Sequence, residues 1–312
     1  MSTNEFDYNG SKLSVYLICL KYEIKASLKN IAKRLLKENR KDVRKVKHRY
    51  SVLNAKQIVI DENLALTDCK QPSWFYTAFE RNDSDPLTNY SLRYIEEKVD
   101  KNAAVLVTGC GTGIMVFHLA DSGFGNIEGI DLLDKCINIA NKIKDRFNYS
   151  GVTFNVDDCL KPTLSGKYDL ITALHWVFSA WMGNYGNDTS ENPFDPGVRE
   201  ELLTELLRNY SGQLNNGGLM IIELTDAVAD YREAYDHPLG LESRNIYPVR
   251  QTPEQVSKCA SAVGLDVVEK KLCVSYGHQP RTTYILKKRL FADPSLQGGS
   301  ETPMRPESSV EG

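Results

Sequence analysis

The sequence predicts an α/β fold in which a mostly parallel sheet is covered by helices on both faces. Three observations predict it: short apolar runs alternate with amphipathic stretches between residues 103 and 224, the first run ends in a glycine-rich turn, and the next two are followed by aspartates. Repeated strand–helix units of this kind build parallel sheets with helices packed on them. With 312 residues and 41% hydrophobic content, the chain can bury a sizeable core.

The alternation gives the expected elements in order. Strands are expected at 103–107, 126–130, 152–156, 168–174, 219–224, 267–274 and 282–287. Helices are expected at 91–99, 114–122, 133–147, 198–214 and 253–262. The last helix has its own start signal, because Thr252 can cap it and Pro253 suits its first turn. The last two strands are expected to pair and to give a seven-stranded sheet an antiparallel edge strand.

The first 69 residues are expected to form a basic helical cap, ahead of a main domain at 70–292 and a disordered tail at 293–312. Between residues 13 and 37, apolar residues recur every three or four positions beside a row of lysines, which is typical of an amphipathic helix. Residues 1–50 hold 13 basic and 5 acidic residues (net +8), and the remainder holds 25 and 36 (net −11). Such a helix can pack as a cap or in a dimer, or make peripheral membrane contact through residues 13–37.

The cysteines and the N-terminal residues indicate the cellular compartment in which the protein works. Seven cysteines are scattered with no Cys-x-x-Cys pair, so neither a disulfide framework nor a thiolate zinc site is indicated. No other clustered ligand spacing is present, and no metal is expected. The apolar stretch at 13–20 is too short to span a bilayer and follows acidic residues, unlike a signal peptide. We therefore expect a cytoplasmic protein.

A Gly-x-Gly-x-Gly turn at residues 109–113 follows the first strand. Glycines there let a ligand approach the backbone, and the next helix begins with unpaired N–H groups. The dinucleotide fingerprint Gly-x-Gly-x-x-Gly needs glycine at position 114, where this chain has Ile114. A pyrophosphate-binding site is therefore disfavoured.

This turn, Asp131 after the second strand and Asp158 after the third resemble the class I S-adenosylmethionine-dependent methyltransferases, a Rossmann-like fold, over residues 91–288. The resemblance implies S-adenosylmethionine as the cofactor, with its methionine part and ribose against the turn. It implies that Asp131 binds both ribose hydroxyls and Asp158 the adenine amino group, since a carboxylate suits a cis-diol. The cofactor-binding residues expected on this basis are Gly109, Cys110, Gly111, Gly113, Asp131, Leu132, Asp157, Asp158, Cys159 and Leu174.

The sequence departs from the family pattern two residues before the first glycine. The family usually has an acid there, which helps to arrange the methionine ammonium, and this chain has Val107 followed by Thr108. The ammonium is then left to backbone carbonyls, to another acid or to Thr108.

His175 follows the fourth strand, where residues of the family border both the sulfonium and the acceptor. Because an imidazole can take a proton from a hydroxyl or amine near neutral pH, His175 is the candidate catalytic base. Methyl transfer from a sulfonium can also proceed by positioning and desolvation alone. Trp176, Phe178 and Trp181 come next and suit either a planar acceptor or the core.

The resemblance implies methyl transfer from S-adenosylmethionine to an oxygen, or a nitrogen, of a small molecule or saccharide. The acidic main domain does not favour a nucleic-acid partner. Two alternatives remain open: an RNA methyltransferase that uses the basic N-terminal helix to follow phosphates, and a non-catalytic scaffold with the same fold. The second is motivated by Val107.

Overall fold

A computed structural model describes residues 46–62, 64, 86–181, 196–225, 251–273 and 281–290. Some predicted features lie outside the described residues. They are the amphipathic helix at 13–37 and the tail at 293–312.

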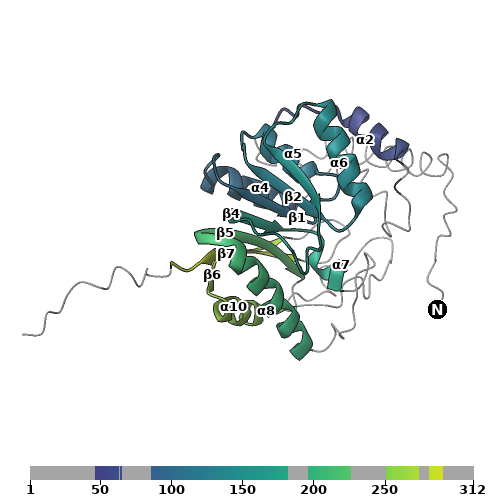
Figure 1. The fold of residues 1–312 in the computed structure, drawn as a ribbon. Helices are drawn as coiled ribbons and strands as arrows, with labels where there is room; N and C mark the ends of the chain where they lie inside the picture. Colours follow the sequence, from purple (N-terminus) through teal and green to yellow (C-terminus); the bar gives the residue numbers. More distant parts are fainter. Residues whose placement is uncertain are drawn as a thin grey trace, which may run out of the picture.

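The described residues form seven strands and seven helices around one sheet (Figure 1). The strands are β1 (Val105–Thr108), β2 (Ile127–Asp131), β3 (Val152–Val156), β4 (Tyr168–Ala173), β5 (Leu214–Thr225), β6 (Leu265–Cys273) and β7 (Arg281–Lys288). The helices are α2 (Val52–Asp61), α4 (Pro86–Lys98), α5 (Ile114–Asp121), α6 (Asp134–Arg146), α7 (Val177–Trp181), α8 (Pro196–Gln213) and α10 (Pro253–Ala262).

The strand order is β3-β2-β1-β4-β5-β7-β6. Strand β1 pairs in parallel with β2 on one side and with β4 on the other, so the connection reverses direction between β1 and β4. In open α/β sheets, ligands bind at this reversal, beyond the carboxyl ends of the strands. The glycine turn after β1 and the segment after β4 therefore lie at the same edge.

The antiparallel strand is β7, which lies between β5 and β6. The predicted fold class, a mostly parallel seven-stranded sheet with an antiparallel strand near its edge, is confirmed. Most predicted strand boundaries agree within two residues. Strand β5 is the exception: it begins at Leu214, because the Asn-Asn-Gly-Gly stretch at 215–218 belongs to the strand, and its register against β4 shifts between Tyr168 and Leu170.

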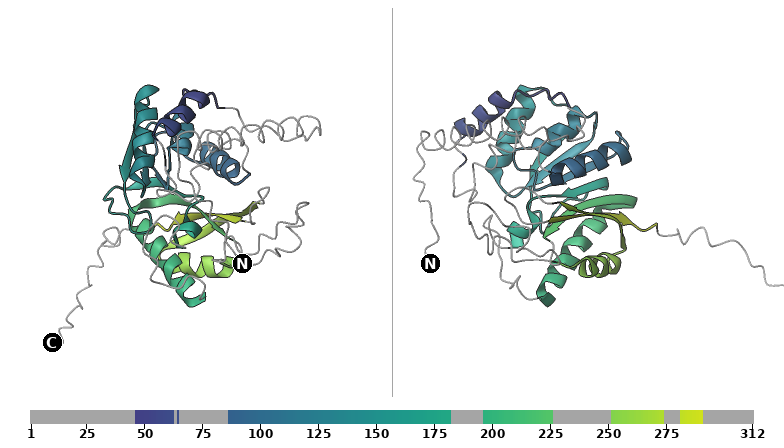
Figure 2. Two further views of the ribbon diagram at one scale, coloured as in Figure 1. Left: turned by 90° about the vertical axis from the view of Figure 1, so that its right-hand side faces the viewer. Right: turned by 180° about the vertical axis from the view of Figure 1, so that it is seen from behind.

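Helices cover both faces of the sheet, as Figures 1 and 2 show. On one face α2, α4, α5 and α6 contribute to one buried apolar cluster, and on the other α7, α8 and α10 contribute to a second. All four β1 residues are buried, as expected for a central strand covered on both sides. Along that strand Val107 belongs to the first cluster and Leu106 to the second. Helix α10 begins with a complete capping box between Thr252 and Gln255, which confirms the predicted start.

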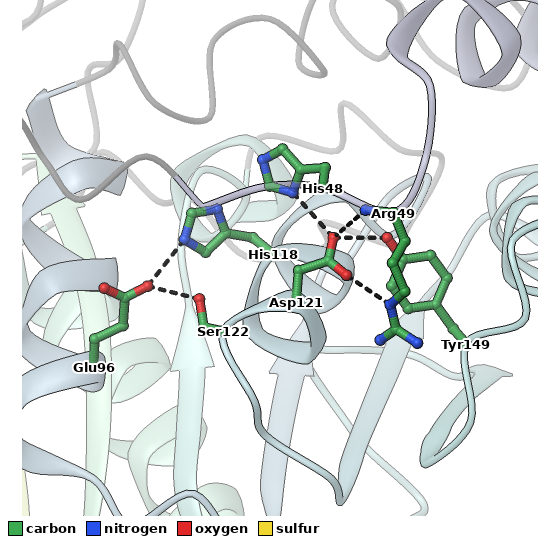
Figure 3. Close-up of polar contacts among 7 residues, drawn as sticks. All are labelled: His48, Arg49, Glu96, His118, Asp121, Ser122 and Tyr149. Carbon is green, nitrogen blue, oxygen red and sulfur yellow. Dashed lines mark hydrogen bonds and ion pairs between the residues drawn. The ribbon is translucent and has the colours of Figure 1, made fainter.

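The described part of the predicted cap, residues 46–62, packs onto the first helical face (Figure 1). Asp121 at the end of α5 anchors it: the carboxylate accepts hydrogen bonds from the backbone N–H of Arg49 at 3.1 Å, its Nε at 2.8 Å and the Tyr149 hydroxyl at 2.8 Å. His48 Nδ1 lies 3.1 Å from the same carboxylate (Figure 3). Burial opposes ionisation, yet these donors hold the pKa of Asp121 below its ordinary value. Domain boundaries at 69 and 292 stay predictions.

Among the described residues, no helix is both long enough and apolar enough to cross a membrane. The same residues contain no cluster of three or more His, Cys, Asp or Glu side chains that suits a metal ion.

Candidate functional site

The turn after β1 folds back on itself through left-handed glycines. Gly109, Gly111 and Gly113 have φ angles of +59°, +54° and +86°, which only glycine adopts at little cost. This conformation turns the Gly111 N–H toward the end of β2, where Asp131 Oδ2 accepts it at 2.7 Å. The turn and the acidic residue therefore form one unit, as the sequence predicts.

Asp131 holds a buried carboxylate beside this turn, with 8% of the residue exposed. Its Oδ2 accepts the Gly111 N–H, and its Oδ1 accepts the Leu133 N–H at 3.0 Å. Burial raises the pKa of Asp131 above its ordinary value, and the two backbone donors oppose that rise. Since each carboxylate oxygen can accept more than one hydrogen bond, both oxygens keep capacity for a ligand donor.

The two acids after β3 have different surroundings. Asp157 is buried and accepts three hydrogen bonds within its own loop, from the N–H of Asp158 at 2.9 Å and from the N–H and hydroxyl of Thr163 at 2.9 and 3.2 Å. Asp158 is less buried, and among the described residues it accepts only the Leu160 N–H, at 2.9 Å. Asp157 thus shapes the loop, which leaves Asp158 as the acid with capacity for an adenine amino group.

Cys159 ties the third loop to the glycine turn. Its buried Sγ accepts the Gly109 N–H at 3.1 Å. Burial raises the pKa values of Cys159 and of Cys110 well above their ordinary range, so both side chains are thiols rather than thiolates. They pack and orient the backbone, and they are not nucleophiles. Leu174 is buried in the same apolar cluster as Cys110, and Leu132 is half-buried directly after β2.

Trp176 closes the other side of the turn. A Cβ atom added to Gly109 would lie 2.3 Å from Trp176 Cδ1, so the ring packs directly against the glycine. The indole Nε1 donates to the Thr108 hydroxyl at 3.1 Å, and this hydroxyl donates to the carbonyl of Thr172 at 2.7 Å. The Thr108 oxygen has two lone pairs and Trp176 occupies one of them, so one remains for a donor such as a cofactor ammonium.

Phe178 and Trp181 are buried with 3% of each residue exposed, and Trp176 with 6%. Of the two roles that the sequence allows this aromatic group, the structure supports the core.

His175 lies where β4 ends, in a left-handed conformation with φ +69°. Its backbone N–H donates to Glu223 Oε2 at 2.5 Å. Its Nδ1 lies 3.2 Å from an Arg281 guanidinium nitrogen and 3.3 Å from Glu223 Oε2, and its Nε2 lies 2.7 Å from the Thr88 hydroxyl. Arg281 also donates to Glu223 Oε1 at 2.5 Å. The imidazole side chain is 20% exposed, whereas the Glu223 side chain is fully buried.

Glu223, Arg281 and Thr88 are functional candidates that the sequence interpretation missed. Glu223 stands within the otherwise apolar run 219–224, and a charged residue there is a signal that a buried partner is needed. Its partner is Arg281, the first residue of β7. The strand register places Arg281 opposite Thr225, the last residue of β5.

The site fits S-adenosylmethionine at the ribose position in particular. A buried carboxylate lies at the end of β2, the turn in front of it can be built only with glycine, and the Thr112 hydroxyl beside them is buried with no hydrogen-bond partner among the described residues. Val107 is buried and apolar, so the chain offers no acid at that position.

The sequence profile of a family described as "Methyltransferase domain" matches residues 99–237 of this chain. Among curated proteins, ribosomal protein L11 methyltransferase of Burkholderia thailandensis is 32% identical over 91 residues, which are 29% of each chain. The mouse EEF1A lysine methyltransferase 2 is 33% identical over 81 residues, 25% of this chain and 33% of that protein. The chain thus spans about a third or less of the length of these relatives.

Solved structures with similar coordinates include a magnesium protoporphyrin IX methyltransferase from Synechocystis PCC 6803 with bound S-adenosylhomocysteine. It is 15% identical, with a TM-score of 0.48 over 64% of this chain and 81% of that chain. The predicted resemblance to methyltransferases is confirmed by the family profile. The individual cofactor-binding residues and His175 stay predictions.

Proposed function

We propose that this chain, whose residues 99–237 match a methyltransferase domain family, is a class I S-adenosylmethionine-dependent methyltransferase that transfers a methyl group to an oxygen or nitrogen of a small molecule or saccharide. The observation that carries the proposal is the bond between the Gly111 N–H and Asp131, which sets a buried carboxylate against a glycine turn at the reversal of the sheet.

In this proposal the chain holds S-adenosylmethionine through three loops. Asp131 accepts the ribose hydroxyls, Asp158 accepts the adenine amino group, and the turn at 109–113 lies along the methionine part. When bound, the cofactor supplies a methyl group already activated on a sulfonium. The protein's contribution is then to bind and orient both partners and to exclude water.

The methionine ammonium needs a partner other than an acid on β1. Val107 is apolar, and the Thr108 hydroxyl already bonds Thr172 and Trp176. We assign the ammonium to backbone carbonyls, to an acid from elsewhere in the chain or to the remaining lone pair of Thr108. A carbonyl gives a weaker bond than a carboxylate, so S-adenosylhomocysteine is expected to bind more weakly than it does to relatives with the acid.

A protein amine is the second candidate acceptor. It is favoured by the two curated relatives, which are named for a ribosomal protein and for a lysine of an elongation factor and are 32% and 33% identical to this chain over short segments. The net charge of −11 on residues 51–312 disfavours a nucleic-acid acceptor, because phosphates are repelled by a negative surface.

The acceptor class can be tested with S-adenosylmethionine labelled in its methyl group. The purified protein is incubated with a lysate of its source, which is then separated into a small-molecule, a protein and an RNA fraction. We expect label in the small-molecule fraction and none with Asp131→Ala. Label in the protein fraction would replace the small-molecule proposal with the second candidate, and label in RNA would support the RNA alternative. No label in any fraction, together with no binding of S-adenosylhomocysteine, would support the scaffold.

A further inference from the structure

His175 is held between three side chains from three other elements. Glu223 comes from β5, Arg281 from β7 and Thr88 from α4, and the two charged groups that face the imidazole have opposite sign. The Glu223 carboxylate accepts both the His175 backbone N–H and the Arg281 guanidinium. The carboxylate thereby fixes the left-handed backbone at His175 and sets where the guanidinium lies.

The hydrogen bond with Arg281 favours one position for the ring proton. A guanidinium nitrogen has only protons to offer, so Arg281 can hydrogen-bond His175 Nδ1 only where Nδ1 presents its lone pair. A neutral imidazole with a free Nδ1 lone pair carries its proton on Nε2. That proton then points to the Thr88 oxygen, 2.7 Å away. Glu223 Oε2, 3.3 Å from Nδ1, already accepts the His175 backbone N–H at 2.5 Å.

We propose that Arg281 and Glu223 hold His175 as a neutral hydrogen-bond donor at Nε2, so that it acts as a positioning residue and not as a base. This inference rests on the proposed methyl transfer. In this state Nδ1 is occupied by the guanidinium and Nε2 already has a proton, so neither nitrogen can accept one from a methyl acceptor. Hydrogen bonds run in one direction, from Arg281 through the imidazole to Thr88, and each bond in such a chain polarises the next.

In this proposal His175 orients neighbouring groups of the site by hydrogen bonding. A donor orients the lone pairs of its partner, while a base would have to gain and lose a proton in each cycle.

The tautomer can be read directly by nitrogen NMR of the full chain labelled at its five histidines. A nitrogen that carries a proton and one that presents a lone pair differ widely in chemical shift, and the signals of His175 are those missing from His175→Gln. We expect a protonated Nε2 and an unprotonated Nδ1 at pH 7.5. A protonated Nδ1, or both nitrogens protonated, would overturn the inference.

Two variants separate donor from base by kinetics. In His175→Gln the amide oxygen can accept from Arg281 and the amide N–H can donate to Thr88, yet a glutamine cannot act as a base. We expect kcat of this variant within about threefold of the wild type, and a loss of about tenfold in His175→Ala, the scale of one hydrogen bond. Equal losses in both variants would overturn the donor role.

His118→Gln is the matched control, because His118 is another buried histidine that contacts a glutamate, Glu96, at 3.2 Å on the first helical face. It should leave kcat unchanged. S-adenosylhomocysteine binding is measured for every variant by calorimetry. If the wild type fails to bind it, the proposed function falls, whereas the NMR result and the Gln–Ala difference bear on the role of His175.

Discussion

Asp131 illustrates how one buried residue can serve both the fold and the site. Its carboxylate loses hydration on burial, and the two backbone donors of Gly111 and Leu133 replace only part of it. A ligand that brings two hydroxyl donors would complete the hydrogen bonding and favour the ionised form. Ligand binding and ionisation of Asp131 should therefore be linked.

This linkage predicts a pH dependence of cofactor binding. Because burial raises the pKa of Asp131, the carboxylate takes up a proton at a higher pH than an ordinary aspartate does. Affinity for S-adenosylhomocysteine should accordingly be constant at neutral pH and fall as the pH is lowered through that raised value. Calorimetric titrations from pH 7.5 down to pH 4.5 measure it. Asp131→Asn should bind weakly at every pH, and an acid decline as steep as that of the wild type would contradict the assignment.

Gly109 offers a second test at the residue scale. An alanine there would strain the left-handed backbone and place its Cβ inside the Trp176 ring, so Gly109→Ala should lower the free energy of unfolding by about 2–5 kcal/mol and weaken cofactor binding. Gly123→Ala is the control, because Gly123 also has a positive φ but no atom within 4 Å of the added Cβ. It should cost only backbone strain, about 1–2 kcal/mol in urea unfolding. Equal effects would show that contact with Trp176 does not matter.

Whether a contact between two residues could be predicted from the sequence depends on how far apart they lie along the chain. Asp131 follows the glycine turn by 20 residues, within one strand–helix–strand unit, so its position could be predicted. The partners of His175 could not, because Thr88, Glu223 and Arg281 lie 87, 48 and 106 residues away and meet it only through strand order and register.

At the scale of elements, the segment before α2 is joined to α5 by one carboxylate. Asp121 takes part in contacts with His48, Arg49 and Tyr149, and the Arg49 guanidinium also lies 4.0 Å from the Tyr149 ring centre (Figure 3). The Asp121 side chain is 1% exposed and that of Arg49 is 42% exposed. The buried carboxylate therefore depends on a partner that is partly in solvent.

Asp121→Asn should lower the free energy of unfolding by about 1–2 kcal/mol at pH 7, discounted for the exposure of Arg49. The pKa of Asp121 is lower in the folded chain than in the unfolded one, so its contribution is present above the ordinary aspartate range and is lost as the pH falls through the lowered value. The difference between variant and wild type in urea unfolding should thus shrink at acid pH.

Glu62→Gln provides the control, since Glu62 pairs with Lys142 across α2 and α6 at a more exposed position. It should change the free energy of unfolding by less than about 1 kcal/mol. If it costs as much as Asp121→Asn, the anchor is not specific to Asp121.

The boundaries of helices and strands were predicted well where hydrophobic periodicity marks one buried face, and less well elsewhere. Strand β3 and helix α6 agree with prediction within about one residue. Helix α4 begins at Pro86 rather than at residue 91, and α7 was not predicted as a helix, because five residues are too few to show a period. Strand β5 includes residues 215–218, whose sequence is typical of a turn. The strand continues through them because its pairing with β4 shifts register there.

At the scale of the molecule, the sheet order brings four loop regions to one edge. The residues after β1, β2, β3 and β4 supply the glycine turn, Asp131, Asp158 and His175, and the two apolar clusters hold the strands that carry them. The fold class and the glycine–aspartate unit were predictable, since both follow from local pattern. The acceptor is not encoded in the same way, because one scaffold serves many chemistries.

Thermal unfolding of the full chain with and without S-adenosylhomocysteine tests the cofactor site most directly. At a ligand concentration of 100 times Kd, binding should stabilise the protein by about 2.7 kcal/mol, or roughly 5–10 °C in Tm. Asp131→Ala should abolish most of this shift, while Asp134→Ala, an exposed aspartate three residues further on, should keep it. No shift in the wild type at saturating ligand would contradict the cofactor site and would make Val107 the decisive departure from the family.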